Sequence, residues 1–388
     1  MCRQKTCLLC LLLAFLYSSC EKNAEITIEP INQGRTLVVY LVADNSISSS
    51  LYTNVKDIVT GLELCKQKGE VIIYWDGHTG DPELLKYKVD AKGNVSQEQV
   101  LRTYQEQNSV DPEVMTNVFN DIFRLSPSES YGLIMGSHGL SWLPESESKK
   151  STRTFGDDKG EEMEISLLNK VLSGVIAKPF DFLLFDACLM SSMEVLYELR
   201  NVAEYIIASP SEILAKGFPY SKIMPLLISD KLADYTRKVA EEFIQYYDYE
   251  FVPRWGTIAV VKCNELEPLA KVTKDILLNN SSKLEDFEIS QLQRYDRTGL
   301  RETNFAFDFE HFIRLLAAPE EYAGFNTQLE KTIIYKDMVE NSFLFYLNKD
   351  NYSGVANYVM QPDKTYLNDY FKTLSWYSAS GWDVTNWN

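Results

Sequence analysis

Histidine and cysteine are scarce in this chain, and their scarcity excludes several kinds of site. Three histidines occur among 388 residues, so a histidine-rich metal centre is not expected. Most of the seven cysteines lie within the first twenty residues, and the others, Cys65, Cys188 and Cys263, are far apart in the sequence. Three isolated thiols provide neither a disulfide framework nor a zinc-binding spacing.

Basic residues are few relative to acidic ones. The chain has 38 Lys and Arg against 55 Asp and Glu, which gives a net charge of -17 and a pI near 4.8. Nucleic-acid binding is excluded on this ground, because phosphate contacts need clustered Lys and Arg. The hydrophobic content of 45% is ordinary for a globular protein, and the length suits one large domain or two modest ones.

An apolar run near the N-terminus is too short to span a bilayer, and no later run reaches spanning length. Arg3 and Lys5 precede this run, and Ser18-Ser19-Cys20 follow it, which predicts a signal peptide over residues 1–20. The segment resembles a bacterial lipoprotein signal with Cys20 as the lipidated residue; plain secretion is the alternative. Residues 21–34 are interpreted as a tether, and the protein is expected in the cell envelope, at the outer membrane or cell surface.

Apolar runs of strand type alternate with amphipathic helical patterns over residues 35–262. Strands are predicted over 36–42, 71–75, 131–135, 182–185, 205–208 and 255–261, with a hairpin-like excursion over 85–104. The alternation indicates an α/β sandwich with a mostly parallel central sheet and helices on both faces. Residues 263–388 are expected to form a C-terminal subdomain packed on this core, with helices over 266–278, 309–316 and 329–338 and a late strand over 354–360.

Two predicted strands end in residues that can carry nucleophilic chemistry. The strand over 182–185 leads into Asp186-Ala187-Cys188, and the strand over 131–135 leads into Ser137-His138-Gly139. The carboxyl edge of a parallel sheet is where α/β proteins place their sites, so we expect Cys188 and His138 to meet there. A thiolate nucleophile needs a nearby base, and His138 is the candidate. His78 also follows a strand and is the rival base.

Backbone groups complete the predicted site. Gly139 allows close approach of a substrate, and its N–H and that of Cys188 can donate to an oxyanion. A helix that starts near Ser192, with Ser191 and Glu194 as a capping box, is expected to favour the thiolate form of Cys188.

The two motifs, in this order and after apolar runs, resemble the signature of clostripain-like cysteine peptidases. These peptidases are grouped with caspases, legumains and gingipains. The segments Ala208–Glu212 and Gly217–Tyr220 also resemble the part that follows in bacterial members. The resemblance covers about residues 36–262 and implies a caspase-like fold and a cysteine endopeptidase in which His138 and Cys188 form the catalytic dyad. The resemblance implies an enzyme that requires no cofactor and acts on protein or peptide substrates.

The resemblance further implies cleavage after Arg or Lys, with Asp186 as the acid of the S1 pocket. From the residues alone, Asp186 could instead cap a helix or orient a neighbour. Family members are often activated by cleavage between the dyad residues. The predicted exposed loop over 141–160 offers three basic candidates for such self-cleavage, Lys149, Lys150 and Arg153, and a plain solvated loop is the alternative.

Calcium is linked with clostripain itself, and two acidic pairs near this loop have suitable side chains. Asp157-Asp158 and Glu161-Glu162 match no EF-hand spacing, so no metal is expected. Two other functions stay open: a catalytically silent surface lipoprotein that binds peptide or glycan, and an amidase or acyl transferase that uses the same dyad. The joint presence of His138, Gly139, Asp186 and Cys188 favours the peptidase.

Overall fold

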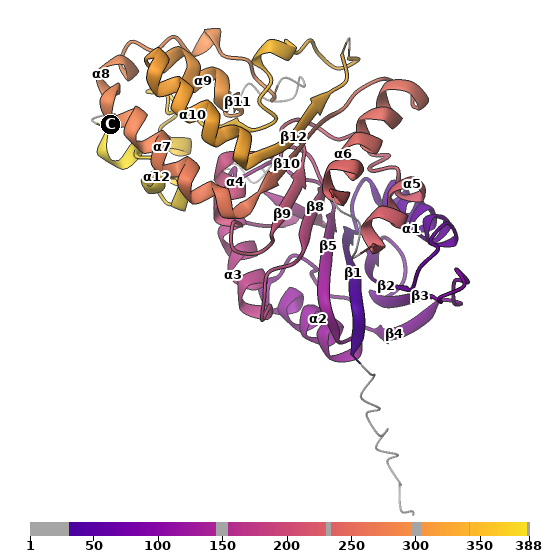
Figure 1. The fold of residues 1–388 in the computed structure, drawn as a ribbon. Helices are drawn as coiled ribbons and strands as arrows, with labels where there is room; N and C mark the ends of the chain where they lie inside the picture. The colour runs from indigo at the N-terminus through magenta and orange to yellow at the C-terminus, as the bar shows by residue number, and fades with distance from the viewer. Residues whose placement is uncertain (1–30, 145–153, 230–233, 297–303, 341, 386–388) are drawn as a thin grey trace, which may run out of the picture.

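A nine-stranded sheet forms the centre of the molecule in the computed structural model, which describes residues 31–144, 154–229, 234–296, 304–340 and 342–385 (Figure 1). The strand order is β12-β10-β9-β8-β5-β1-β2-β3-β4. The strands are β1 (Asn32–Ala43), β2 (Gly69–Gly77), β3 (Glu83–Val89), β4 (Gln99–Thr103), β5 (Ser128–Gly136), β8 (Phe182–Asp186), β9 (Tyr205–Ala208), β10 (Thr257–Lys262) and β12 (Ile333–Met338). From β2 to β9 neighbouring strands are parallel, and the pairs towards both edges are antiparallel.

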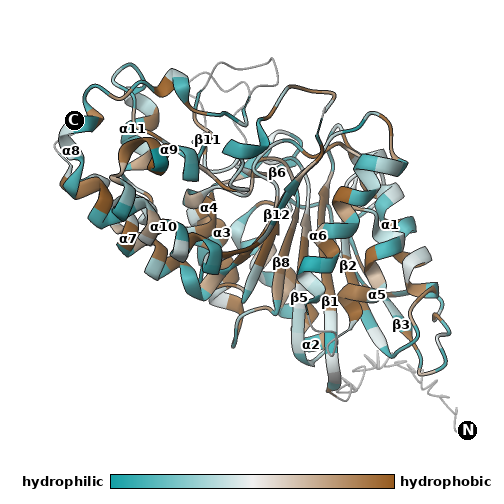
Figure 2. Ribbon diagram, turned by 45° about the horizontal axis from the view of Figure 1, so that its top comes forward, coloured by the Kyte–Doolittle hydropathy of each residue, from teal (hydrophilic) through white to brown (hydrophobic). Residues whose placement is uncertain are grey.

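Helices cover both faces of this sheet, and Figure 2 shows apolar residues concentrated in the strands between them. Along β1, Val39 and Leu41 pack in the cluster that contains α1, α5 and α6 residues, whereas Val38 and Tyr40 pack on the opposite face with α2, α3 and α4. Side chains alternate between the faces of a strand, so a strand covered on both faces is a continuous apolar run. The helices are α1 (Ser48–Glu63), α2 (Pro112–Leu125), α3 (Ile165–Val175), α4 (Met193–Glu198), α5 (Tyr220–Ile228), α6 (Tyr235–Gln245), α7 (Leu266–Asn279), α8 (Ser281–Leu284), α9 (Phe309–Leu316), α10 (Pro319–Thr332), α11 (Thr365–Phe371) and α12 (Ser375–Ala379).

The predicted α/β sandwich is confirmed, and the excursion after β2 extends the sheet. Its two strands, β3 and β4, pair antiparallel with β2 and with each other. Small two-stranded ribbons lie outside the main sheet: β6 (Phe155–Asp158) with β7 (Glu161–Met163), and β11 (Phe307–Asp308) with β13 (Ala356–Asn357). Single turns of 3₁₀ or π type add Tyr246–Glu250, Cys263–Glu265, Ile289–Gln291, Lys349–Asn351 and Trp382–Val384. Among the described residues, no helix is both long and apolar enough to cross a membrane.

The residues after 262 pack on the core and also complete the sheet. The helix expected over 329–338 is wrong in its second half, because α10 ends at Thr332 and Ile333–Met338 forms strand β12. β12 pairs antiparallel with β10, with Thr257 opposite Met338. The late strand expected over 354–360 is reduced to Ala356–Asn357. Pairing with β10 decides the first case, since the tertiary context overrides local helix propensity.

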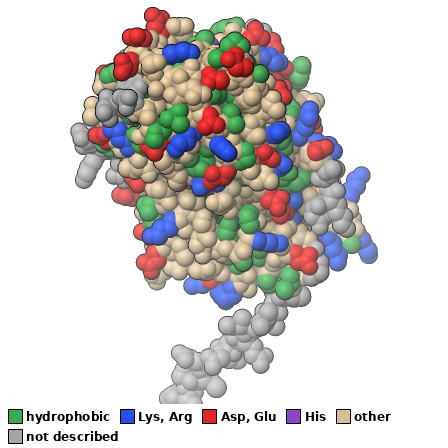
Figure 3. Space-filling model, turned by 60° about the vertical axis from the view of Figure 1, so that its left-hand side comes forward, with side chains coloured by type: hydrophobic (Ala, Val, Ile, Leu, Met, Phe, Trp, Pro, Cys, Tyr) green, Lys and Arg blue, Asp and Glu red, His purple; other side chains and the backbone are tan. Residues whose placement is uncertain are grey.

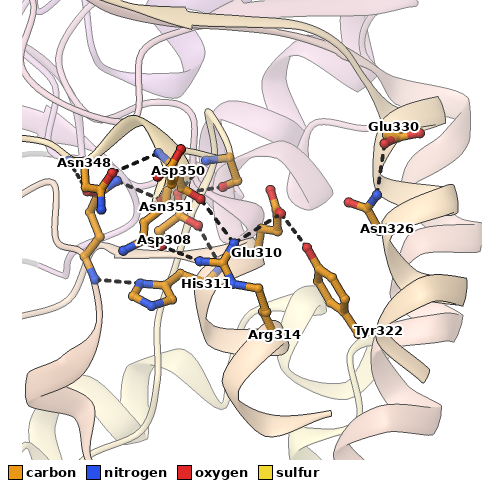
Figure 4. A network of polar contacts seen from close by, with 12 residues as sticks. Asp308, Glu310, His311, Arg314, Tyr322, Asn326, Glu330, Asn348, Asp350 and Asn351 are labelled. Carbon is orange, nitrogen blue, oxygen red and sulfur yellow. Dashed lines mark hydrogen bonds and ion pairs between the residues drawn. The ribbon is translucent and has the colours of Figure 1, made fainter. Parts of the chain in front are cut away.

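A polar network joins the segments of this C-terminal part (Figure 4). Asp308 caps α9: its carboxylate accepts from the backbone N–H of His311 at 2.9 Å and from that of Ser353 at 2.7 Å. The ring Nδ1 of His311 accepts from the Gln293 N–H at 3.2 Å. His311 is buried and links α9 to the backbone of Gln293. Arg314, one turn further along α9, donates to the carbonyl of Asp350.

Charge on the surface is mixed in sign. The face in Figure 3 carries Lys and Arg interspersed with Asp and Glu. Pairs such as Lys336 with Glu310, at 3.1 Å, and Arg200 with Glu267, at 2.7 Å, link acids to neighbouring cations. The acidic excess of the chain is therefore not gathered into one field on this face, which is the pattern of a surface charged for solubility.

The start of α4 differs from the predicted capping box. Ser192 is the N-cap and accepts from the Val195 N–H at 3.4 Å, whereas the Ser191 hydroxyl donates to the Gly354 carbonyl at 2.8 Å. Glu194 is fully buried, and its carboxyl accepts from the Tyr358 N–H at 2.7 Å. Ser191 and Glu194 thus attach the C-terminal part to the core. Burial raises the pKa of Glu194 to about 7.

We expect Glu194→Gln to reduce the pH dependence of stability. A carboxyl whose folded-state pKa lies above its unfolded value contributes stability at low pH and loses it as the pH rises through the folded value. The wild type should lose about 2 to 3 kcal/mol of unfolding free energy from this group between pH 5 and pH 8. Glutamine keeps the acceptor and cannot ionise. Urea unfolding at the two pH values measures this loss, and Glu285→Gln on the surface is the control. An equal change in unfolding free energy between the two pH values for wild type and Glu194→Gln would contradict the prediction.

Candidate active site

Two neighbouring parallel strands end at the same level and bring the two predicted motifs together. In the β5–β8 pair Gly136 lies opposite Asp186, so His138 and Cys188 each follow two residues beyond this last pair. Adjacent strands are about 4.8 Å apart. Gly139 lies against the turn at Cys188: a Cβ at Gly139 would stand 2.8 Å from the Cys188 carbonyl oxygen and 3.0 Å from the Ala187 Cβ. Only a glycine fits there, because the two backbones approach too closely for a side chain.

His138 is half-buried, and one contact holds its ring while another holds its backbone. Its Nε2 shares a hydrogen bond of 2.8 Å with the hydroxyl of Ser46, which follows β1. The His138 carbonyl accepts from the Gly156 N–H at 3.0 Å, which ties the turn to β6. Sequence reasoning missed Ser46. A signal was present, because Asp44-Asn45-Ser46 is a polar run at the carboxyl end of a buried strand.

The thiol of Cys188 is held by the backbone of Ile213. Its Sγ lies 3.5 Å from the Ile213 carbonyl oxygen and 3.3 Å from the Ile213 nitrogen, whose N–H donates to it. Burial raises the pKa of Cys188 to about 12, and the negative charges of Glu212 and Asp186 act in the same direction. The expectation that a helix start favours the thiolate is therefore wrong for this state, since α4 begins only at Met193 and desolvation dominates.

The turn after Cys188 is strained and is tied to the segment after β9. Leu189 has φ of 62°, a left-handed conformation that is uncommon for a residue with a side chain. Its N–H donates to the Ser211 carbonyl at 2.9 Å, and the Ser191 N–H donates to the Ser209 carbonyl at 2.9 Å. Strain of this kind is retained where the surrounding contacts determine the backbone, and it clusters at functional sites. The N–H groups of Gly139 and Cys188, in contrast, donate to none of the described residues.

Asp186 is the last residue of β8, and its buried carboxyl is surrounded by polar groups. Its Oδ2 accepts from the Tyr220 hydroxyl at 2.8 Å and from the Asn54 amide at 3.3 Å. A Cβ at Gly217, which has φ of 68°, would stand 2.4 Å from the same oxygen. Burial raises the pKa of Asp186 to about 6, and the Tyr220 hydrogen bond, the backbone N–H of Phe218 and the charge of Lys216 oppose the rise. Sequence reasoning missed Asn54 and Tyr220, although Asn54 is a polar residue in the apolar stripe of α1.

His78 is not brought to the thiol. It follows β2, which is separated from β8 by β1 and β5. Three strand spacings correspond to about 14 Å. His78 is more than half exposed, and its Nδ1 lies 2.6 Å from Oδ1 of Asp44. The geometry therefore leaves His138 as the histidine next to Cys188.

The structure describes both ends of the segment expected as an exposed loop over 141–160, and residues at each end are buried. Trp142 and Leu143 are buried, and Phe155–Asp158 forms β6, in which Asp157 and Asp158 are also buried. The expectation is wrong for these residues, because Trp142, Leu143 and Phe155 pack in the hydrophobic core. Outside the described residues lie the candidate cleavage sites Lys149, Lys150 and Arg153.

The two acidic pairs considered for calcium do not converge. Oδ1 of Asp157 accepts from the Gly160 N–H at 2.8 Å, and Asp158 accepts from the Ser109 N–H. Glu161 is exposed. Within the described ranges, no group of three or more His, Cys, Asp or Glu side chains is arranged to hold a metal ion.

Comparison with known proteins places this geometry in a family. Residues 39–387 match the model of the clostripain family, peptidase family C11. The curated protein clostripain of Hathewaya histolytica is 26% identical over 220 residues, a match that spans 50% of this chain and 42% of that protein.

Two solved structures are similar over nearly their whole length. An inactive zymogen of a C11 protease from Parabacteroides distasonis is 34% identical with a TM-score of 0.79, and the match covers 90% of this chain and 99% of that one. A secreted C11 cysteine protease from Bacteroides thetaiotaomicron, solved with an irreversible peptide inhibitor, is 31% identical with a TM-score of 0.78 over the same shares. The chain belongs to the clostripain family of cysteine peptidases.

Proposed function

We propose that this protein is a cysteine endopeptidase that cleaves peptide bonds after Arg or Lys with a dyad of His138 and Cys188. The observation that carries the proposal is the close packing of Gly139 against the backbone of Cys188 at the ends of β5 and β8. This packing supports the proposal, because it brings the turn that follows β5 against the turn that carries Cys188 at the carboxyl edge of the sheet. Family membership supports the peptidase class, and the two residues supply the nucleophile and the base that such chemistry needs.

In the proposed reaction, His138 takes the thiol proton as Sγ of Cys188 attacks the scissile carbonyl carbon. The carbonyl oxygen becomes an oxyanion, and the free N–H groups of Gly139 and Cys188 are suited to receive its charge. His138 then gives the proton to the leaving amine, and a thioester remains on Cys188. Water, deprotonated by His138, hydrolyses the thioester and restores the thiol.

In the described state the thiol is engaged by the Ile213 backbone, so the proposed reaction includes a rearrangement that releases it. Sγ is bonded to the Ile213 backbone, and burial raises the pKa of Cys188 to about 12. A shift of the segment around Ile213 would expose the sulfur and let His138 approach it. The relative from Parabacteroides distasonis is described as an inactive zymogen, which supports a latent state in this chain as well. We propose that cleavage within residues 141–160 triggers this rearrangement.

Asp186 is the proposed acid of the S1 pocket. It lies two residues before the nucleophile, and Tyr220 and Asn54 fix one of its oxygens. Burial raises its pKa to about 6, so a buried site without a cation favours the neutral form at slightly acid pH. A guanidinium or ammonium in the pocket would favour the carboxylate and form a charge-assisted hydrogen bond with it.

We expect Cys188→Ala and His138→Ala to abolish turnover of fluorogenic peptides that end in Arg or Lys, with kcat/KM reduced by about a thousandfold or more. His78→Ala, at the rival histidine, should keep activity within about threefold, because His78 lies three strands away. Peptide mapping of wild type and Cys188→Ala adds a second readout: cuts at Lys149, Lys150 or Arg153 should appear in the wild type alone. No thiol-dependent turnover by trypsin-nicked wild type would favour the silent lipoprotein that binds peptide or glycan.

We expect Asp186→Asn to lose selectivity more than chemistry. The variant keeps the size of the side chain and removes the charge that would pair with the substrate. Its kcat/KM for Arg- and Lys-terminated peptides should fall by about a hundredfold or more, because a buried cation is left without its partner. Turnover of a matched Gln-terminated peptide should change by less than about threefold. An equal fall on all peptides would assign Asp186 a structural role instead.

Export with a lipid anchor on Cys20 is the remaining part of the proposal. Its support is the composition of residues 1–20 and the description of one relative as secreted. In a bacterial host with lipoprotein processing, the wild type should partition into the detergent phase, and its N-terminal peptide should carry the mass of the attached lipid. Cys20→Ser should stay in the aqueous phase. An unmodified Cys20 in the exported wild type would support plain secretion.

A further inference from the structure

An aromatic and acidic pocket lies beside α1, away from the thiol. Its volume is about 390 Å³, and it is formed between α1 and the face of β2 and β3 that α1 covers. Trp75 on β2 lies opposite Glu83 on β3, and Tyr87, four residues further along β3, lies on the same side of the sheet. Tyr52 on α1 closes the pocket, with its ring 5.7 Å from that of Trp75. Three aromatic rings and two carboxylates, those of Glu83 and Glu98, therefore line one cavity.

The chemistry of this lining suits a cation. Ring faces of Trp and Tyr attract an ammonium or guanidinium group, and carboxylates add charge complementarity. The structure contains such a contact: Nζ of Lys56 lies 4.3 Å from the centroid of the Tyr52 ring. Glu98 accepts from the Tyr87 hydroxyl. The backbone of Glu83 pairs with β2, but its side-chain carboxylate makes no hydrogen bond or ion pair with any of the described residues. Glu83 thus leaves a negative charge available at the wall of the pocket.

One helix separates this pocket from the proposed S1 acid. Asn54 of α1 reaches Asp186 on one side, and Tyr52 and Lys56, each two positions away along the helix, point towards the pocket on the other side. A helix with its side chains is about 10 to 12 Å wide. An extended peptide covers about 3.3 to 3.6 Å per residue. A polypeptide bound at Asp186 would therefore reach the pocket with a residue at least about four positions from the cleaved bond.

We propose that the pocket of Tyr52, Trp75, Tyr87, Glu83 and Glu98 is an exosite that binds a second Lys or Arg side chain of a polypeptide substrate. The inference rests on the proposed peptidase function for its substrate, but the pocket and its preference for a cation do not depend on the dyad. Lys56 competes for the same ring face, so the incoming side chain displaces it or shares the pocket with it. The exosite lowers KM for substrates with two basic residues suitably spaced, and leaves kcat unchanged.

Two variants should change binding in opposite directions. Glu83→Gln removes the available charge without changing size, and Lys56→Ala removes the competing cation. On a long peptide with a second lysine about five residues from the cleaved bond, a distance that spans α1, Glu83→Gln should raise KM about five- to tenfold and Lys56→Ala should lower it. On a short peptide with one basic residue, both variants should match the wild type. Glu113→Gln, an exposed acid on α2 across the sheet, is the matched control.

Binding without turnover separates this inference from the proposed function. In the Cys188→Ala background, fluorescence anisotropy of the labelled two-lysine peptide should show about a five- to tenfold weaker Kd with Glu83→Gln and a stronger one with Lys56→Ala, and affinity should fall with added salt. If wild type cleaves nothing but these shifts in Kd appear, the exosite stands and the peptidase proposal fails. Equal Kd for all variants, or an equal effect of Glu83→Gln on long and short peptides, would overturn the exosite.

Discussion

Backbone pairing between β5 and β8 is the constraint on which the site depends. A parallel ladder fixes its two strands residue by residue, so Gly136 opposite Asp186 determines where both following turns begin. The absent side chain of Gly139 then lets the turn at Cys188 come within backbone contact. Where these two turns meet, Ser46 contacts the side chain of His138, and Ile213 contacts the thiol of Cys188.

Burial strengthens the preference of several groups of the molecule for their neutral form. Desolvation raises the pKa of Asp186 to about 6 and that of Cys188 to about 12, and Glu194 titrates at about 7. Under the proposed function the first two would respond to the substrate, because a cation at Asp186 and an opened path from Cys188 to His138 would each favour the charged form. Glu194 faces the Tyr358 backbone and has no such partner, so it serves attachment of the C-terminal part.

The C-terminal residues affect the site through the segment after β9. Ser211 accepts at its carbonyl from Leu189, next to the nucleophile, and its hydroxyl donates to the Tyr295 carbonyl at 3.3 Å. Tyr295 in turn bonds Asp308, the cap of α9. A continuous set of hydrogen bonds therefore runs from the strained turn at Leu189 into the network of Figure 4. The part of the chain after residue 262 supports the geometry of the edge as well as the end of the sheet.

The sequence by itself determined the local elements and the two motifs. Apolar runs with turns after them predicted the core strands, and the order of His138 and Cys188 after two of these strands predicted their meeting. The sequence did not determine which residues from other segments contact Asp186 and Cys188. Asn54 and Tyr220 reach Asp186 from helices 132 and 34 residues away in the chain, and Ile213 holds the thiol from another segment.

Tertiary structure decided three points that local patterns had assigned differently. Residues 333–338 have a helical pattern but pair with β10 as the edge strand of the sheet. The stability gained from this pairing exceeds a weak local preference for helix. The capping oxygen of α4 belongs to Ser192, because Ser191 and Glu194 are used to attach residues 354–358. The pKa of the Cys188 thiol is raised and not lowered, because desolvation outweighs the effect of a short helix that begins beyond it. In each case a long-range contact or desolvation, neither of which a local pattern contains, exceeds the local preference in energy.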